Sequence, residues 1–388
     1  MVRSSPHEPH QPHLPSTRSA ASAAVVHSPS HERPIRPPKS TKDPNRPAPA
    51  SRCAPPRHAL SLKPCGEPPW ARADSTSPGS PFGTWQLGGD WGSFDDDAAV
   101  QVIQHARELG VNFFDTAQAY GFGKSEAILG RSLRDELKRD RDSLVIATKG
   151  GINPGSDRPR DARRHWLRKG VDESLRHLDL DHIDLYQVHW PDPDTPAEET
   201  SQALQELVDA GKIRHVGVSN YDTAQLAAFD RTRSVETLQP PYHLFRRALE
   251  DDPLPYCREH DIGVLVYSPL GSGLLTGALN PRTTFEPGDW RANSSASRAR
   301  TSRRTWRSWS SSRTSRPRRA PPSASSPSRG PCTNRGGHVA IVGARRARNI
   351  EDSVAAADLD LIGDDLARIE KIASRGVQAE GASPEGVA

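Results

Sequence analysis

The sequence predicts an α/β protein whose parallel strands close into a (β/α)8 barrel, and three observations carry that prediction. Short apolar runs alternate with amphipathic stretches from Phe82 onward, which is the pattern of parallel βα units. The part of the chain with the composition of a folded domain has 264 residues, close to the ~250 of one such barrel. No Gly-x-Gly-x-x-Gly sequence follows the first run, which counts against a doubly wound nucleotide-binding sheet.

Eight apolar runs are expected to form the strands of the barrel. Each is short and apolar and is separated from the next by a helical stretch. In chain order they are residues 82–87, 111–117, 144–149, 183–189, 215–219, 237–239, 262–268 and 339–343.

Helices are expected between the strands. Residues 95–109, 125–138 and 167–178 carry apolar side chains three or four positions apart, so each stretch can bury one helical face. Thr195-Pro196-Ala197-Glu198 has the form of a capping box with proline at the first helical position. Gly211 is expected to end the helix that follows it.

Two segments differ in composition from the barrel, which we assign to residues 81–388. Residues 1–80 hold 17 prolines, and 294–337 hold 13 serines and 11 arginines but no acidic residue and no Leu, Ile, Val or Met. Neither can bury an apolar face. We expect a disordered or non-native tail at 1–80 and an unstructured interruption between strands seven and eight at 294–337. The abrupt edges of 294–337 suggest a shifted reading frame.

The distribution of charge and cysteine limits the partners of the barrel. The whole chain carries a net charge of +4, but the two unusual segments contribute +17 and leave −13 for the remainder. An acidic domain is a poor match for nucleic acid, whose phosphates attract basic residues. No apolar run is long enough for a membrane helix, and no Cys-x-x-Cys pair suggests a metal site. We expect a cytoplasmic protein with no nucleic-acid, membrane or metal partner.

Polar residues follow the strands at the edge where barrels of this kind carry their chemistry. Asp115 and Tyr120 follow the second strand, Lys149 ends the third and His189 ends the fourth. A phenol is a poor proton donor at neutral pH, but a neighbouring ammonium lowers the pKa of a phenol and a carboxylate keeps the ammonium charged. Each residue alone could be a cap, a surface charge or a packing residue. Their convergence predicts a proton-transfer site.

These residues stand in ordered motifs that resemble the aldo-keto reductase superfamily. The first is Asp-Thr-Ala-x-x-Tyr-Gly-x-Gly-x-Ser-Glu at 115–126. The second is Leu-x-x-Leu at 175–178, followed by Asp-Leu-Tyr-Gln-Val-His-Trp-Pro at 184–191. Gly-Val-Ser-Asn at 217–220 and Tyr-Ser-Pro-Leu at 267–270 also match.

The resemblance implies a TIM barrel that reduces aldehydes or ketones to alcohols by hydride transfer from NADPH. Tyr120 matches the general acid that protonates the carbonyl oxygen, and Lys149 with Asp115 matches the pair that tunes it. His189 matches the residue that orients the substrate.

The resemblance also implies binding residues. Trp85 and Trp190 match positions that line the substrate pocket. Arg345 matches a position that pairs with the 2′-phosphate, which favours NADPH over NADH because a guanidinium suits phosphate. Arg346, Arg348 and Asn349 are near alternatives. The cofactor-binding positions together are Ser219, Asn220, Gln239, Tyr267, Ser268, Leu270, Gly343, Arg345 and Asn349.

Two other interpretations stay open. The same catalytic set occurs in cofactor-binding barrels that act as regulatory beta subunits of potassium channels, and a shifted frame would give an inactive, damaged reductase. Turnover of an aromatic aldehyde with NADPH separates the first from an enzyme. A cooperative melt that NADPH shifts upward argues against the second. The sequence predicts neither the particular carbonyl substrate nor the oligomeric state.

Overall fold

The structure is a computed structural model that describes residues 81–280, 282–286, 288–292, 338–359, 361 and 363–374. The chain divides into two units, Met1–Lys63 and Pro64–Ala388, and every described residue belongs to the second. The expected tail at 1–80 and the expected interruption at 294–337 both lie outside the described residues.

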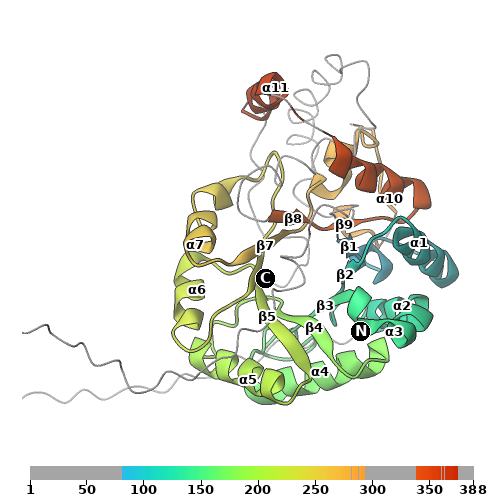
Figure 1. The fold of residues 1–388 in the computed structure, drawn as a ribbon. Helices are drawn as coiled ribbons and strands as arrows, with labels where there is room; N and C mark the ends of the chain where they lie inside the picture. Colours follow the sequence, from blue (N-terminus) through green and yellow to red (C-terminus); the bar gives the residue numbers. More distant parts are fainter. Residues whose placement is uncertain are drawn as a thin grey trace, which may run out of the picture. The chain divides into compact units, whose positions relative to one another are not determined.

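One parallel sheet forms the centre of the fold (Figure 1). Its strands are β1 Phe82–Gly83, β2 Phe113–Asp115, β3 Val145–Gly150, β4 Ile183–Val188, β5 Ile213–Ser219, β6 Thr237–Gln239, β7 Gly263–Val266, β8 His338–Ala340 and β9 Val342–Gly343. They are ordered β8-β7-β6-β5-β4-β3-β2-β1-β9. Each strand therefore lies beside its neighbour in the chain, as a βα barrel requires.

The last strand segment closes the ring. β8 pairs with β7, β9 pairs with β1, and only Ile341 lies between β8 and β9. The N–H of Ile341 donates to the carbonyl oxygen of Val266 at 2.8 Å, and that of Val342 donates to Pro81 at 3.0 Å. The eighth strand predicted at 339–343 thus bonds first to one edge of the sheet and then to the other, and the predicted barrel is confirmed.

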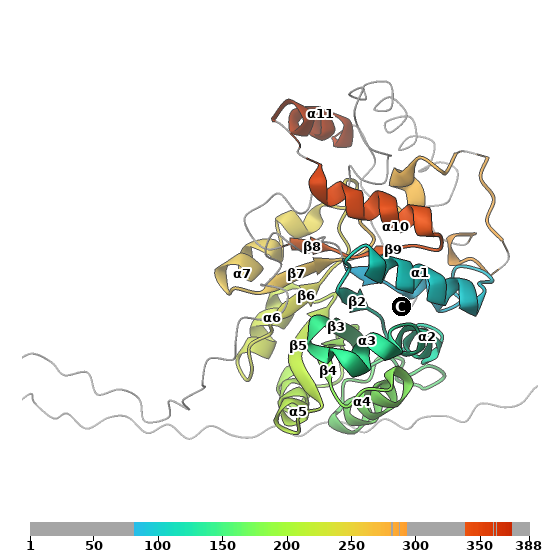
Figure 2. The ribbon, with the colours of Figure 1, turned by 45° about the vertical axis from the view of Figure 1, so that its right-hand side comes forward.

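Helices surround the ring of strands in both views (Figures 1 and 2). Their amphipathic stripes face the strands; α4, for example, buries Leu167, Val171 and Leu178. The bounds are α1 Asp96–Glu108, α2 Lys124–Ser132, α3 Arg134–Arg139, α4 Arg164–Leu178, α5 Ala197–Asp209, α6 Thr223–Asp230, α7 Leu254–Glu259, α10 Ala347–Val354 and α11 Gly363–Ala373.

Two expected elements are interrupted. The first strand ends at Gly83, and Trp85–Leu87 forms a 3₁₀ turn instead of continuing it. The helix expected at 125–138 is two helices, because Leu133 leaves the helical region between α2 and α3, with φ −110° and ψ 11°.

The capping box expected at Thr195 is wrong. Pro196 itself occupies the N-cap of α5, and no side chain caps the helix. The Thr195 hydroxyl donates to the Asp192 carboxylate at 2.6 Å instead. A cap would use Oγ1 as an acceptor, and that oxygen instead accepts from Arg158 Nη2 at 3.1 Å. Gly211 follows the helix with φ 71°, as predicted.

The barrel interior has an apolar layer and a polar layer. The apolar layer is one buried cluster that includes Phe113, Ala147 and Leu185. Strand side chains alternate between faces with a period of two, so the residues two positions later point to the same interior. They are Asp115, Lys149 and Gln187, all buried, and the fold therefore collects the polar residues at the carboxyl ends of the strands.

No helix in the part of the chain that the structure describes is long and apolar enough to cross a membrane.

Candidate active site

Lys149 is the centre of the polar layer. Its ammonium Nζ lies 2.6 Å from Asp115 Oδ1, 2.8 Å from the carbonyl oxygen of Thr116 and 3.3 Å from Tyr120 Oη. Lys149 is 1% exposed and Asp115 3%, so the ion pair has little contact with water. The arrangement predicted from the strand ends is thus present: a carboxylate, an ammonium and a phenol in one chain of hydrogen bonds.

Two glutamines hold the other oxygen of the Asp115 carboxylate. Gln239 Nε2 donates to Oδ2 at 2.9 Å and Gln187 Nε2 at 3.3 Å. Gln239 was expected to bind the cofactor, and here its amide also supports the carboxylate. Gln187 was missed by the sequence reasoning. Its position two residues before His189 was the available signal, because alternate residues of a strand share a face.

The Tyr120 side chain lies between Lys149 and His189. Its ring centroid is 5.7 Å from the His189 ring, with the planes nearly perpendicular at 81°. The backbone of Tyr120 packs directly against Gly88, where a Cβ would lie 2.8 Å from the tyrosine carbonyl carbon. The close approach of the two loops therefore requires glycine at position 88 and fixes the phenol at the edge of the interior.

A second hydrogen-bond chain joins the expected nicotinamide-binding residues. Tyr267 Oη donates to Asn220 Oδ1 at 2.9 Å, and Asn220 Nδ2 donates to the carbonyl oxygen of His189 at 3.0 Å. Ser219 Oγ donates to the carbonyl oxygen of Gln239 at 2.8 Å. Asn220 is left-handed, with φ 64°, a conformation that asparagine tolerates better than most residues. These contacts tie the ends of β4, β5, β6 and the β7 loop together.

A cavity of about 640 Å³ opens beside Tyr120 and extends to α10. Ten of the predicted site residues line it: Trp85, Asp115, Tyr120, Gln239, Tyr267, Ser268, Leu270, Gly343, Arg345 and Asn349.

Five predicted site residues are absent from the described residues that line this cavity. Lys149, Ser219 and Asn220 instead form hydrogen bonds to lining residues, and the His189 ring contacts Tyr120. Trp190 packs under the Arg160 guanidinium, 5.0 Å from the ring centroid. Its role in the substrate pocket stays a prediction.

Arg345 lies at the cavity but bonds to the protein. Its Nη1 donates to the carbonyl oxygen of Trp91 at 2.8 Å and its Nη2 to that of Ser93 at 2.5 Å. The guanidinium also lies 4.9 Å from the Phe94 ring centroid. It therefore fastens the loop after β9 to the loop after β1. Arg348 on α10 lines the same part of the cavity.

Three tryptophans form a wall next to Tyr120, and two of them were missed by the sequence reasoning. Trp85 lies 6.3 Å from Tyr120, 5.0 Å from Trp91 and 5.6 Å from Trp290, between ring centroids. Trp290 comes from the segment after β7 and stacks on Trp85 at 27°. Only Gly-Asp-Trp-Gly at 89–92, directly after the Trp85 motif, could have pointed to Trp91.

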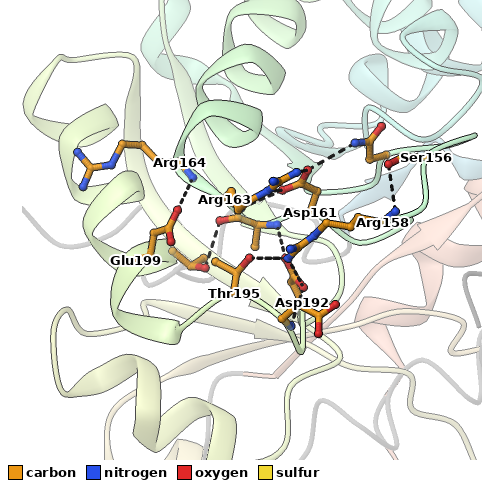
Figure 3. Close-up of polar contacts among 12 residues, drawn as sticks. Ser156, Arg158, Asp161, Arg163, Arg164, Asp192, Thr195 and Glu199 are labelled. Atoms are coloured by element: carbon orange, nitrogen blue, oxygen red, sulfur yellow. Dashed lines mark hydrogen bonds and ion pairs between the residues drawn. The ribbon is translucent and has the colours of Figure 1, made fainter.

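The loops after β3 and β4 are joined by buried carboxylates (Figure 3). Asp192 accepts from Arg158 Nη2 at 3.0 Å, Thr195 Oγ1 at 2.6 Å and the Ala162 N–H at 2.9 Å. Burial disfavours its charge, but these donors outweigh burial and hold the pKa of Asp192 below its ordinary value. Because Asp192 lies three residues after His189, the network fixes the loop that leaves the site.

The donors at the cavity suit a nucleotide cofactor better than a metal. No cluster of His, Cys, Asp and Glu among the described residues could hold a metal ion. Amide, hydroxyl and guanidinium groups of Gln239, Ser268, Asn349 and Arg348 line the cavity together with Gly343. A Cβ at Gly343 would lie 1.9 Å from Gln86 Oε1, so a side chain there would require the Gln86 amide to move.

Comparison with known families agrees with this geometry. The profile described as "Aldo/keto reductase family" matches residues 81–374. This chain belongs to the aldo/keto reductase family. The match begins at the first described residue and ends at the last, and the resemblance drawn from the motifs is confirmed.

Two curated reductases and one potassium channel subunit are similar to this chain. The aldo-keto reductase YhdN of Bacillus subtilis (strain 168) is 44% identical over 212 residues, which are 54% of this chain and 63% of the relative. The NADH-specific methylglyoxal reductase of Escherichia coli (strain K12) is 36% identical, over 58% of this chain and 73% of the relative. A probable voltage-gated potassium channel subunit beta of Arabidopsis thaliana is 38% identical, over 51% of this chain and 62% of the relative. The match with the first relative spans less than two thirds of its length.

Solved structures of the family superpose on the barrel. A glycerol dehydrogenase from Gluconobacter oxydans is 35% identical with a TM-score of 0.69, covering 78% of this chain and 93% of the other. An aldo-keto reductase from Klebsiella pneumoniae in complex with NADPH is 27% identical with a TM-score of 0.59, covering 76% and 91%.

Proposed function

We propose that this protein reduces a small aldehyde or ketone to the alcohol with NADPH, in the cytoplasm, and that Tyr120 is the general acid. The observation that carries the proposal is the buried chain from Asp115 through Lys149 to Tyr120, which ends in a cavity. Family membership and the NADPH complex of the Klebsiella reductase support the reaction type and the cofactor.

Tyr120 Oη is the atom that gives its proton to the carbonyl oxygen. The Lys149 ammonium, 3.3 Å from Oη, stabilises the negative charge that forms on the phenol oxygen as the proton leaves. Asp115 holds that ammonium in place. His189, ring to ring with Tyr120, orients the carbonyl oxygen toward the phenol.

The cofactor is proposed to occupy the cavity between Tyr267 and α10. Bound there, NADPH would supply the hydride. Gln239, Ser268 and Asn349 line the cavity and offer hydrogen bonds. Ser219 and Asn220 stand behind them. Arg345 remains the proposed partner of the 2′-phosphate, although its guanidinium already donates to two carbonyl oxygens, and Arg348 is its alternative.

The test is NADPH oxidation by the full chain against a panel of aldehydes and ketones, followed at 340 nm. Tyr120→Phe removes the proton donor and keeps the ring, so we expect a loss of kcat on the order of a hundredfold or more. The melting temperature of both proteins with and without NADPH serves as the control for folding and cofactor binding. Equal activity of the wild type and Tyr120→Phe would remove the phenol from the mechanism.

The preference for NADPH over NADH is tested separately. Arg345→Gln and Arg348→Gln are assayed with NADPH and with NADH, because loss of the residue that holds the 2′-phosphate affects only NADPH. The E. coli relative named as NADH-specific makes the comparison necessary.

A regulatory barrel is the second candidate, and the likeness to the Arabidopsis channel subunit favours it. Cofactor binding without turnover of any carbonyl compound would select it. The third alternative is a chain damaged by a shifted frame at 294–337. Such a chain is expected to show no cofactor binding and no cooperative melt.

A further inference from the structure

The Gln239 side chain has two neighbours that fix the direction of its amide. Its Nε2 donates to Asp115 Oδ2 at 2.9 Å and to Gln187 Oε1 at 3.3 Å. The NH2 group of a glutamine carries two hydrogens, so both are used inside the barrel. The amide oxygen Oε1 accepts no hydrogen bond from the described residues, and it is not one of their fully enclosed, unpartnered atoms. Oε1 is therefore the atom that this side chain has left to offer to a molecule in the cavity, which Gln239 lines.

The charge of Asp115 decides which way round the amide lies. A carboxylate only accepts hydrogen bonds, so an amide oxygen turned toward Asp115 would face another oxygen with no proton between them. Gln187, which is fully buried, also has to donate, and its Nε2 lies 3.3 Å from the same Oδ2. The Gln187 oxygen then faces Gln239 Nε2. The three side chains form a closed ring of hydrogen bonds, and the direction of each bond follows from one negative charge.

The strands that carry this ring of hydrogen bonds hold it in place. Gln187 on β4 lies opposite Gly217 on β5. A Cβ at Gly217 would lie 2.9 Å from Gln187 Cγ, so glycine at this position leaves room for the glutamine. The backbone carbonyl oxygen of Gln239 accepts from Ser219 Oγ at 2.8 Å and from the Asn220 N–H at 3.2 Å. Gln239 is therefore held at its backbone as well as at its amide.

We propose that Asp115 has a second role besides holding Lys149: together with Gln187 it fixes Gln239 as a hydrogen-bond acceptor, so that the site selects a cofactor with an N–H donor on its nicotinamide carboxamide. The inference rests on the proposed cofactor site, and it makes Asp115 and Gln187 positioning residues for cofactor specificity. A site with a fixed acceptor discriminates against an analogue that lacks the donor, because the buried acceptor is then left unpaired.

The experiment measures the binding of three oxidised cofactors to the full chain by titration calorimetry, without turnover. NADP⁺ carries the carboxamide. Its thionicotinamide analogue keeps the NH2 group and replaces the oxygen by sulfur, whereas its 3-acetylpyridine analogue keeps the oxygen and replaces the NH2 group by methyl. In the wild type we expect NADP⁺ and the thionicotinamide analogue to bind with similar Kd. The acetylpyridine analogue is expected to bind about tenfold more weakly, the effect of one hydrogen bond.

Two variants remove the source of that preference in different ways. Gln239→Leu deletes the acceptor and leaves the Asp115–Lys149 pair intact, so the Kd ratio of the acetylpyridine analogue to NADP⁺ is expected to fall close to one. The double variant Asp115→Asn with Lys149→Met removes the carboxylate and its cation together. An asparagine amide can donate as well as accept, so the Gln239 amide is free to turn round, and the ratio is again expected to approach one.

Lys149→Met alone is the matched control. It breaks the same ion pair but keeps the carboxylate that faces the two glutamines, so the Kd ratio is expected to stay near the wild-type value. A melt of each variant, followed by circular dichroism, checks that the variant folds. If Lys149→Met does not fold, Gln239→Leu and the double variant still decide, since neither leaves a buried carboxylate without its cation.

The outcomes are distinct. Equal Kd values for NADP⁺ and the acetylpyridine analogue in the wild type overturn the inference while the use of the cofactor stands. A preference that survives Gln239→Leu, or that a folded Lys149→Met protein loses as fully as the double variant does, also overturns it. The expected ratios without turnover of any carbonyl compound support the inference and select the regulatory barrel as the function. If NADP⁺ does not bind at all, the proposed function and the inference fail together.

Discussion

Replacing Lys149 by methionine separates the stabilising role of the ammonium from its catalytic role. Methionine keeps an unbranched side chain but removes all three of the contacts that Nζ makes, to Asp115, Thr116 and Tyr120. The Asp115 carboxylate, 3% exposed, is then left buried without a cation. Breaking a buried ion pair in this way costs about 3–5 kcal/mol. The two glutamine N–H donors that Asp115 keeps favour the lower end of that range.

Urea unfolding of the full chain, followed by circular dichroism, measures the stability change. The expected loss is a large part of the ~5–15 kcal/mol that stabilises a typical domain. Lys169→Met is the control on the same type of residue. Lys169 is 57% exposed and 3.7 Å from Glu173, and an exposed pair of this kind contributes at most about 1 kcal/mol.

The double variant Asp115→Asn with Lys149→Met decides between the two roles. It removes both charges of the Asp115–Lys149 pair, so we expect it to recover most of the lost stability. Its kcat is expected to stay lower than wild type by about a hundredfold or more, because nothing stabilises the charge on the Tyr120 oxygen. A Lys149→Met protein as stable as wild type would refute the buried-charge argument. Recovery of kcat in the double variant would refute the catalytic one.

Three further predictions concern the framework of the site. Asp192→Asn removes the charge to which Arg158 and the nearby N–H and O–H donors bond. We expect urea unfolding to show that the free energy of unfolding falls by about 1–3 kcal/mol. The control Asp194→Asn, at an exposed position, is expected to leave it unchanged. Burial, and then the nearby Arg246, lower the pKa of His243 from 6.5 to about 4, and the Phe245 N–H donates to its Nδ1. The unfolded chain therefore binds more protons than the folded chain between these pH values. The free energy of unfolding is thus full above about pH 6.5 and falls by up to about 3 kcal/mol toward pH 4. If the melting temperature of His243→Gln falls as steeply with decreasing pH as that of the wild type, this reasoning is wrong. Gly150→Ala puts a Cβ 1.9 Å from Tyr186 Oη, and this clash is expected to lower the melting temperature. Adding Tyr186→Phe to the same chain is expected to restore most of the lost melting temperature. No recovery in the double variant would show that the strain does not come from the Tyr186 hydroxyl.

The barrel and its polar edge were predictable because they depend on local patterns. Apolar runs and helical stripes specify the strands and helices one by one, and parallel strands can be joined only through such crossovers. Asp115, Tyr120, Lys149 and His189 were found because each stands at, or just after, the end of a strand. The period of two along a strand would also have found Gln187, whose neighbour Val188 faces the opposite side.

Contacts that depend on competition between groups distant in sequence were not predictable. Thr195 Oγ1 does not cap its helix and instead accepts from Arg158 Nη2, 37 residues earlier in the chain. Arg345, expected at a phosphate, donates to the carbonyl oxygens of Trp91 and Ser93, 252–254 residues away in the chain. A local pattern carries no information on which of two such partners is closer in the folded protein.

The sequence by itself determined the fold class and the family, and it brought together the residues proposed for proton transfer, because strand order makes the ends of successive strands meet. Only the tertiary structure decided that Trp85, Trp91 and Trp290 form one wall, since Trp290 joins the other two from the segment after β7. It also decided that the Trp91 indole N–H has no partner in the described chain, because hydrogen-bond satisfaction is a property of the whole packed interior and not of any local stretch.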